Sequence, residues 1–217
     1  MLAQHSPAPE TPVPLPQALR TSGAELLTPA RGARLRIIGA SGQRRPLQVR
    51  ALSSRDLQWL PALADLLIDS VHHGASLGFL APMSRYQAMD HWHAVYARLG
   101  SRHQLWIACE DEGHGPLHGA VQLSLPGEGQ VHHRGEVQRL MVHSQERGRG
   151  IASQLMGALE HGARRQGLSL LVLDTPADSQ AEAVYTHLGW QRAGEIPGFS
   201  ACAEGRLQSA ALLYKKL

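Results

Sequence analysis

The feature that most constrains this chain is a glycine-rich segment between a β-prone run and a helical pattern. The segment, residues 147–152, reads RGRGIA and follows the β-prone run 136–143. Apolar residues then recur at helical spacing from Ile151 to Ala163, and a short apolar run follows at 168–173. A strand, a helix and a second strand in this order form a right-handed crossover with parallel strands. The sequence therefore predicts a mixed α/β domain.

The glycine-rich segment is also a candidate anion site. The first N–H groups of a helix lack intrahelical partners, and the helix dipole favours a negative charge there. Gly148 and Gly150 allow positive φ angles and a close approach of the backbone to a phosphate. A P-loop would need Lys and Ser or Thr after the glycines, where Ile151 and Ala152 stand. A tight turn that binds no ligand is the alternative interpretation.

Periodicity places further elements along the chain. Residues 47–51 alternate like a strand, and Ser53 or Ser54 is a candidate cap for a helix over 57–71. The other predicted elements are a loop over 72–79, a helix over 89–99, strands over 104–110 and 117–125, a helix over 181–188, and short strands near 190 and over 207–214.

The first 46 residues differ in composition from the rest and are predicted to be a Pro/Arg-rich disordered tail. Seven of the 13 prolines precede residue 47. Residues 1–50 hold seven Arg against Glu10 and Glu25, whereas the remainder holds 14 basic and 16 acidic side chains. The predicted domain, 47–217, therefore lacks the net positive charge that nucleic-acid binding needs.

Other classes of protein are disfavoured as well. No run approaches the roughly 20 apolar residues of a membrane span, and the N-terminus does not read as a secretory signal, so we expect a cytoplasmic protein. Cys109 and Cys202 are predicted to be free thiols. The histidine pairs are spaced so that their side chains diverge, and no metal site is expected.

Several blocks together resemble a known family. The run 137–142, followed by Arg147-x-x-Gly150-x-Ala152, resembles motif A of the GNAT acetyltransferase superfamily, and 181–190 resembles its motif B. The blocks 71–79, 173–175 and 194–199 are similar to the tabtoxin-resistance acetyltransferases. The resemblance covers about residues 49–217.

This resemblance implies a fold and a cofactor. The fold is a central mixed, mostly antiparallel sheet with flanking helices, in which a bulged strand splays from its parallel neighbour. Acetyl-CoA is the implied acyl donor. Where many relatives have an asparagine seven residues before the motif B tyrosine, this chain has Asp178. The residues implied to hold acetyl-CoA are Leu140, Met141, Val142, Arg147, Gly148, Arg149, Gly150, Ile151, Ala152 and Ser153.

Acyl transfer needs a base for the acceptor and a proton for the departing thiolate. Glu136 opens the motif A strand and Asp174 lies at the end of the adjacent one, and by resemblance this acidic pair deprotonates the acceptor. Tyr185 is the implied general acid. The structural alternatives are an exposed strand carboxylate for Glu136 and a core tyrosine for Tyr185.

The implied function is direct transfer of an acetyl group, in a ternary complex, to an amine or hydroxyl of a small polar molecule, with a β-lactam toxin as one candidate. His72, Ser76 and Phe79 are candidate acceptor contacts, with ordinary loop residues as the alternative. A non-catalytic acyl-CoA-binding module and a protein N-terminal acetyltransferase are the rival interpretations. Loops expected at 72–79 and 195–200 favour an enclosed pocket over a peptide groove. Homodimer formation is left open.

Overall fold

The computed structural model describes residues 46–110, 115–126, 131–202 and 205–217. The predicted tail lies outside these residues except for Pro46, so its boundary stays a prediction. Most of the predicted turn between the strands at 104–110 and 117–125 lies outside them too.

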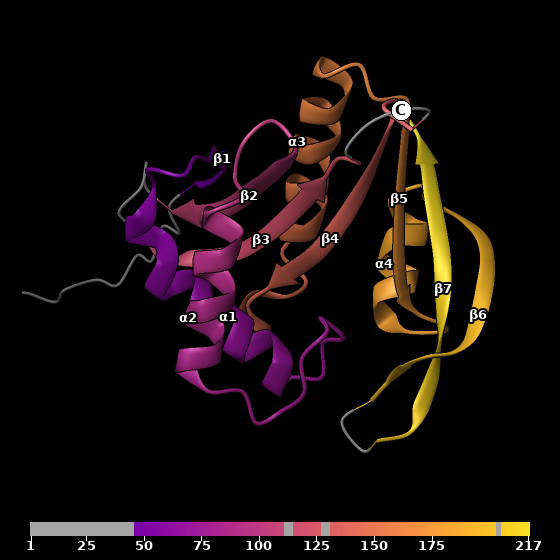
Figure 1. Cartoon of the computed structure of the whole chain (residues 1–217), viewed down its shortest axis with the longest axis horizontal. Helices are drawn as coiled ribbons and strands as arrows, with labels where there is room; N and C mark the ends of the chain where they lie inside the picture. The colour runs from indigo at the N-terminus through magenta and orange to yellow at the C-terminus, as the bar shows by residue number, and fades with distance from the viewer. Residues whose placement is uncertain (1–45, 111–114, 127–130, 203–204) are drawn as a thin grey trace, which may run out of the picture. The chain divides into compact units, whose positions relative to one another are not determined.

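One seven-stranded sheet organises the described residues, in the order β1-β2-β3-β4-β5-β7-β6 (Figure 1). Every neighbouring pair is antiparallel except β4 and β5, which are parallel. The predicted mixed, mostly antiparallel sheet with one parallel pair is therefore confirmed. The strands are β1 (Leu47–Leu52), β2 (His103–Glu110), β3 (Leu117–Ser124), β4 (Arg134–Val142), β5 (Leu170–Pro176), β6 (Gln191–Ala201) and β7 (Leu207–Lys216).

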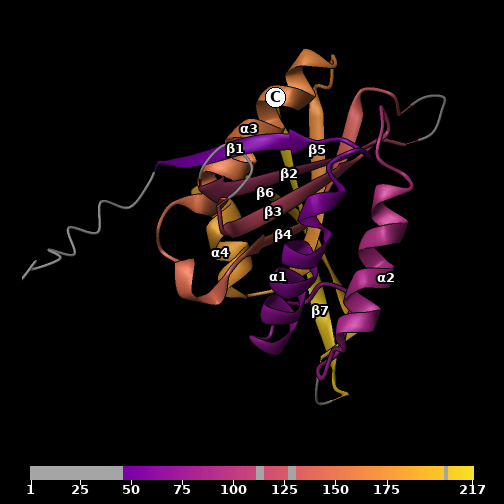
Figure 2. The same cartoon turned by 90° about the vertical axis from the view of Figure 1, so that its left-hand side faces the viewer.

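In the described part of the chain, four α-helices cover the two faces of this sheet. Helices α1 (Leu60–His72) and α2 (Arg85–Tyr96) lie on one face, and α3 (Ile151–Arg165) and α4 (Gln180–His187) on the other (Figure 2). Because successive strand residues point to opposite faces, β2 contributes to both cores. Leu105 and Ile107 pack with α1 and α2, whereas Trp106 and Ala108 pack with α3.

The start of α1 differs from the prediction. Neither Ser53 nor Ser54 caps the helix, because a 3₁₀ turn over Leu57–Trp59 comes first and α1 begins at Leu60. The Ser53 hydroxyl instead donates to the carboxylate of Asp56 at 2.7 Å. A serine before a helical pattern marks a local turn here, not the first residue of the α-helix.

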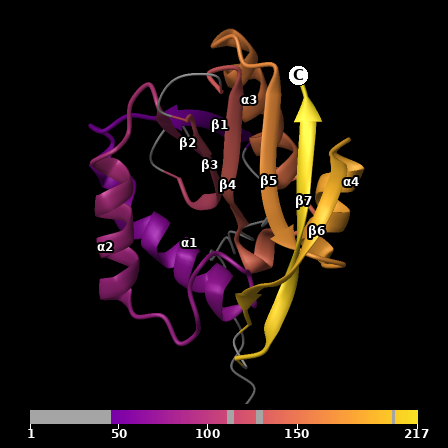
Figure 3. The ribbon, with the colours of Figure 1, turned by 45° about the vertical axis from the view of Figure 1, so that its right-hand side comes forward.

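The C-terminal region also differs. Residues 195–200, predicted as a loop, belong to the long edge strand β6, which pairs with β7 (Figure 3). The register shifts between Ile196 and Ser200, where Gly198 has a φ of 62°. Glycine and proline in this stretch therefore mark an irregularity within a strand.

Candidate active site

The two parallel strands pair over only part of their length. Their register runs from Arg134 opposite Leu170 to Glu136 opposite Val172. Beyond this point β4 and β5 diverge toward their C-terminal ends (Figure 1). Within the described residues, the β5-facing edge of β4 therefore has no strand partner after Glu136. Backbone N–H and C=O groups along this edge are available to an extended ligand.

A bulge lies in β4 just beyond the last parallel pair. Gln138 is opposite Gln122 and Met141 is opposite Ala120, so Arg139 and Leu140 together face a single β3 residue. Arg139 has a φ of 49°, a left-handed conformation uncommon outside glycine. Bulges of this kind bend a strand and redirect its side chains. The bulge and the splayed pair are the features that the family resemblance implied.

The structure brings Glu136 and Asp174 together. Glu136 pairs with Val172, and Asp174 lies two residues farther along β5, so both carboxylates point to the same face of the sheet. The pKa of Asp174 is raised, first by partial removal from water and then by the negative charge of Glu136. Glu136 accepts a hydrogen bond from Gln138 Nε2 at 2.8 Å. This arrangement suits a base that gains a proton more readily than an ordinary carboxylate.

Tyr185 on α4 lies close enough to Asp174 to interact with its charge. Burial, together with that charge, raises the pKa of the phenol, so it holds its proton at neutral pH. The ring also packs edge-on against Trp190, at 5.8 Å between centroids, within the core on the α3 side. The tyrosine is thus a core residue whose phenol is affected by the charge of Asp174.

The glycine-rich segment has the geometry expected of an anion site. Gly148 and Gly150 have φ angles of 78° and 73°, and Gly150 is the N-cap of α3 with no side-chain hydrogen bond. The first α-helical bond runs from Gln154 N to Gly150 O. The N–H groups of Ile151, Ala152 and Ser153 precede it and are free for an anion, which fits a pyrophosphate.

The two arginines of this segment have different surroundings. Arg147 is exposed, whereas the Arg149 guanidinium pairs with Glu146. Glu146 also lies 3.8 Å from His118 Nδ1, and His118 Nε2 is 3.1 Å from Glu110. A phosphate that recruits Arg149 has to compete with Glu146.

Asp69, near the end of α1, anchors the chain just before the glycine-rich segment. Its carboxylate accepts hydrogen bonds from Ser144 N and Ser144 Oγ, both at 2.7 Å. Burial by itself raises the pKa of Asp69, but these two bonds, together with the charges of His143 and His73, lower it below the usual value. Sequence reasoning missed this residue, because an aspartate on a helix gives no signal of a partner 75 residues away.

The remaining residues predicted to contact acetyl-CoA or the acceptor differ in burial and in their partners. Met141 is buried in the core under α1, while Leu140 and Val142 pack partly against the other core. His72 accepts a hydrogen bond from Met83 N at 3.1 Å, Ser76 is exposed, and the ring of Phe79 contacts that of His91 at 5.1 Å between centroids. His72 thus holds the segment before α2.

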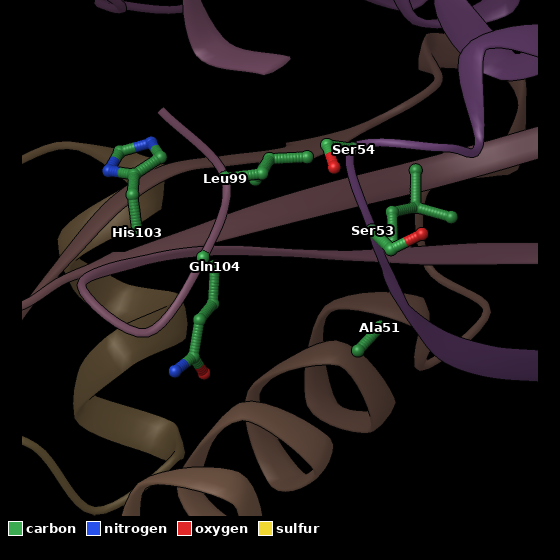
Figure 4. A pocket seen from close by; sticks show the side chains of 8 residues that line it. Ala51, Ser53, Ser54, Leu99, His103 and Gln104 are labelled. Atoms are coloured by element: carbon green, nitrogen blue, oxygen red, sulfur yellow. The ribbon is translucent and has the colours of Figure 1, made fainter. Parts of the chain in front are cut away.

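A separate pocket lies between the end of β1 and the start of β2 (Figure 4). Its volume is about 270 Å³, and its lining includes Ala51, Ser54, Leu99, His103 and Gln104. None of the residues implied in acetyl-CoA binding or acid–base chemistry lines it.

Cys109 and Cys202 are both free thiols, as predicted. Residues 46–110, 115–126, 131–202 and 205–217 contain no group of three or more His, Cys, Asp or Glu side chains placed to hold a metal ion. No helix in that part of the chain is long and apolar enough to cross a bilayer.

Comparison with known proteins agrees with this geometry. The sequence model of the acetyltransferase (GNAT) family matches residues 63–190. A GCN5-related N-acetyltransferase from Kribbella flavida is similar in structure, with a TM-score of 0.63 and 20% identity over 79% of this chain and 98% of that one. A putative phosphinothricin N-acetyltransferase gives a TM-score of 0.64 and 19% identity over 79% and 99% of the chains. YncA from Salmonella typhimurium, solved with acetyl-CoA, gives a TM-score of 0.62 and 18% identity over 79% and 94%.

Proposed function

The chain belongs to the GNAT acetyltransferase family, whose acyl donor is acetyl-CoA, and we propose that it acetylates an amine or hydroxyl of a small polar acceptor directly, in a ternary complex. One observation carries this proposal. The parallel pairing ends at Glu136, and Asp174 lies two residues beyond the partner of Glu136 with a raised pKa. An acidic pair therefore stands where the β5-facing edge of β4 loses its strand partner.

The chain has residues suited to both ends of acetyl-CoA. The backbone of Leu140, Met141 and Val142 would pair with the pantetheine arm, since this edge of β4 lacks a strand partner among the described residues. The amides from Gly148 to Ser153 would hold the pyrophosphate, with Arg147 and Arg149 beside it. When bound, acetyl-CoA supplies the acetyl group as an activated thioester.

The proton transfers are assigned to three side chains. An acceptor amine is protonated at neutral pH and must lose a proton before it is nucleophilic. Glu136 and Asp174 would take that proton, and the raised pKa of Asp174 makes it a stronger base than a free carboxylate. Tyr185 would donate a proton to the thiolate, because a phenol is protonated at neutral pH.

The acceptor is proposed from the local blocks that resemble the tabtoxin-resistance acetyltransferases. These blocks, 71–79, 173–175 and 194–199, favour a small amino-acid-like toxin such as a β-lactam. Of the two loops that argued against a peptide groove, the one at 195–200 is instead part of β6. Peptides therefore belong in the set of acceptors to be tested.

The experiment measures thiol release from acetyl-CoA with small amines, alcohols and N-terminal peptides as acceptors. Turnover with a small amine supports the proposal, and turnover with peptides alone favours a protein N-terminal acetyltransferase. Calorimetric binding of acetyl-CoA without turnover of any acceptor would indicate a binding module. Glu136→Gln tests whether the observed turnover depends on the acidic pair.

A further inference from the structure

Three side-chain nitrogen atoms without hydrogen-bond partners lie around the β4 bulge, on the α2 side of the sheet. Arg139 Nε, His91 Nε2 and Gln122 Nε2 are each buried, and none of them has a hydrogen-bond partner. Gln122 is fully buried, and its oxygen lies 3.0 Å from His103 Nε2. Buried polar atoms are nearly always hydrogen-bonded, so three unpaired atoms in one neighbourhood need an explanation.

The bulge itself places the guanidinium of Arg139 in this neighbourhood. Arg139 adopts the uncommon positive φ of 49°. Burial lowers the pKa values of His91 and His103, and the positive charge of Arg139 lowers them further, so both imidazoles are neutral at pH 7. Partial burial is the main cause that lowers the pKa of Arg139, and the charge of Arg98 adds to it. A guanidinium held among other basic groups favours the approach of a negative charge.

In the described part of the chain, no carboxylate of the protein forms an ion pair with Arg139. Glu136 lies near enough to interact with Arg139, but no ion pair within 4.0 Å joins them, and Glu136 is bonded to Gln138 instead. His91 is flanked by Asp90, whose charge has the smallest of the effects on its pKa. A partly buried arginine without an anion is costly, because burial weakens its hydration without replacing it.

The neighbourhood also borders the predicted acceptor contacts. His91 on α2 touches the ring of Phe79 at 5.1 Å, and Phe79 is one of the proposed acceptor residues. Arg139 is three residues after Glu136 on the same strand. An anion bound here would therefore sit between the proposed acceptor loop and the proposed base.

We propose that Arg139 and His91, backed by the amide of Gln122, bind an oxyanion of the acceptor, so that the substrate is a small molecule carrying a carboxylate or a phosphonate beside the group that is acetylated. The proposal rests on the proposed acetyl transfer and narrows its substrate class. Arg139 binds the oxyanion through its forked N–H groups, which match the geometry of a carboxylate or phosphonate. His91 and Gln122 contribute neutral N–H donors.

The first experiment compares three sets of acceptors that share the same amine: α-amino acids, their carboxamides, and α-aminophosphonates. Thiol release from acetyl-CoA is expected with an oxyanion set, and kcat/KM for the carboxamides should be about 10- to 100-fold lower, the usual effect of losing a charged hydrogen-bond partner. The acids and phosphonates compared with each other identify the preferred oxyanion. Equal turnover of acids and carboxamides would overturn the proposal.

Arg139→Gln tests the residue by removing the guanidinium and its charge while leaving a polar side chain that can still form hydrogen bonds. We expect it to raise the KM of the oxyanion acceptor about 10- to 100-fold, with little change in the KM of acetyl-CoA. Arg165→Gln makes the same charge change at an exposed position near the end of α3 and should have no effect. His91→Gln is the second variant if Arg139→Gln does not fold. An unchanged oxyanion preference in a folded variant at Arg139 or His91 would refute the assignment.

A readout independent of turnover separates this proposal from the proposed function. Histidine-labelled protein saturated with coenzyme A is titrated with the same three sets, and His91 signals are assigned from His91→Gln. Oxyanions should shift these signals, carboxamides should not, and Arg139→Gln should abolish the shift. Shifts without thiol release would contradict acetyl transfer but not the oxyanion site. Absence of shifts, or equal shifts from carboxamides, would overturn the site.

Discussion

Replacing glycine by alanine should change the free energy of unfolding differently at three glycines of the α3 region. Gly150 has a φ of 73°, and a Cβ added there would meet no heavy atom within 4 Å. Its cost is therefore conformational and not steric. The left-handed region costs a residue with a Cβ roughly 1–2 kcal/mol, which exceeds the gain of about 0.4–1 kcal/mol from a less flexible unfolded chain. Gly150→Ala should lower the free energy of unfolding by about 1 kcal/mol.

Gly157 and Gly162 are the matched controls within α3. A Cβ at Gly157 also meets nothing within 4 Å, but its backbone is helical, so alanine should raise the free energy of unfolding by about 0.5–1 kcal/mol. A Cβ at Gly162 would lie 2.8 Å from Trp106 Cζ2. Overpacking of this kind typically costs about 1–3 kcal/mol.

Urea unfolding of the three variants, followed by far-UV circular dichroism, measures these differences directly. A change of 1 kcal/mol in a chain of this size moves the melting temperature by about 2–4 °C, so calorimetry provides a second measure. Stabilisation by Gly150→Ala, or destabilisation by Gly157→Ala, would show that the backbone conformations assigned to this helix are wrong. Coenzyme A affinity of the Gly150 variant then tests whether the same conformation aims the amides at a phosphate.

Three further predictions concern the carboxylates. Glu136→Gln should lower kcat by about 10²- to 10⁴-fold and leave acetyl-CoA affinity nearly unchanged, and full turnover across pH 6–9 would remove Glu136 as the base. Because the pKa of Asp174 is raised in the folded state, the folded protein loses stability as the pH rises through that pKa and the carboxyl ionises. Asp174→Asn removes this loss, so it should raise the melting temperature, relative to the unmodified protein, more at pH 7 than at pH 3. An equal difference at both pH values would contradict the pKa shift. Asp69→Ala removes both hydrogen bonds to Ser144, so it should lower the free energy of unfolding by about 1.5–3 kcal/mol and weaken coenzyme A binding. The control Asp65→Ala, on the same helix, breaks only an exposed ion pair with Arg85 and should lower the free energy of unfolding by less than about 1 kcal/mol. Equal losses from the two variants would show that Asp69 does not anchor the glycine-rich segment.

Sequence periodicity was sufficient for the elements whose pattern reflects burial in a single core. The apolar spacing from Ile151 to Ala163 predicted α3, because that stripe packs against the sheet. Periodicity failed where glycine and proline lie inside a strand. Residues 195–200 read as a loop, but pairing with β7 supplies hydrogen bonds that override the local preference, and Gly198 absorbs the irregularity.

Part of the candidate site could likewise be predicted from the sequence, and part could not. The two glycines and the acidic pair follow from local motifs and from the ends of neighbouring strands, which a sequence displays. The environment of Arg139 does not follow from the sequence, because a charged residue in a strand is expected to be exposed. Only the register of β4 against β3 shows that two residues face one and that the chain turns to a positive φ there. That turn places a guanidinium among unpaired donors, and no alternation of polar and apolar residues along β4 records it. The proposed specificity for the acceptor therefore depends on the strand register that the structure shows, whereas the proposed acetyl-CoA site could be predicted from a sequence motif.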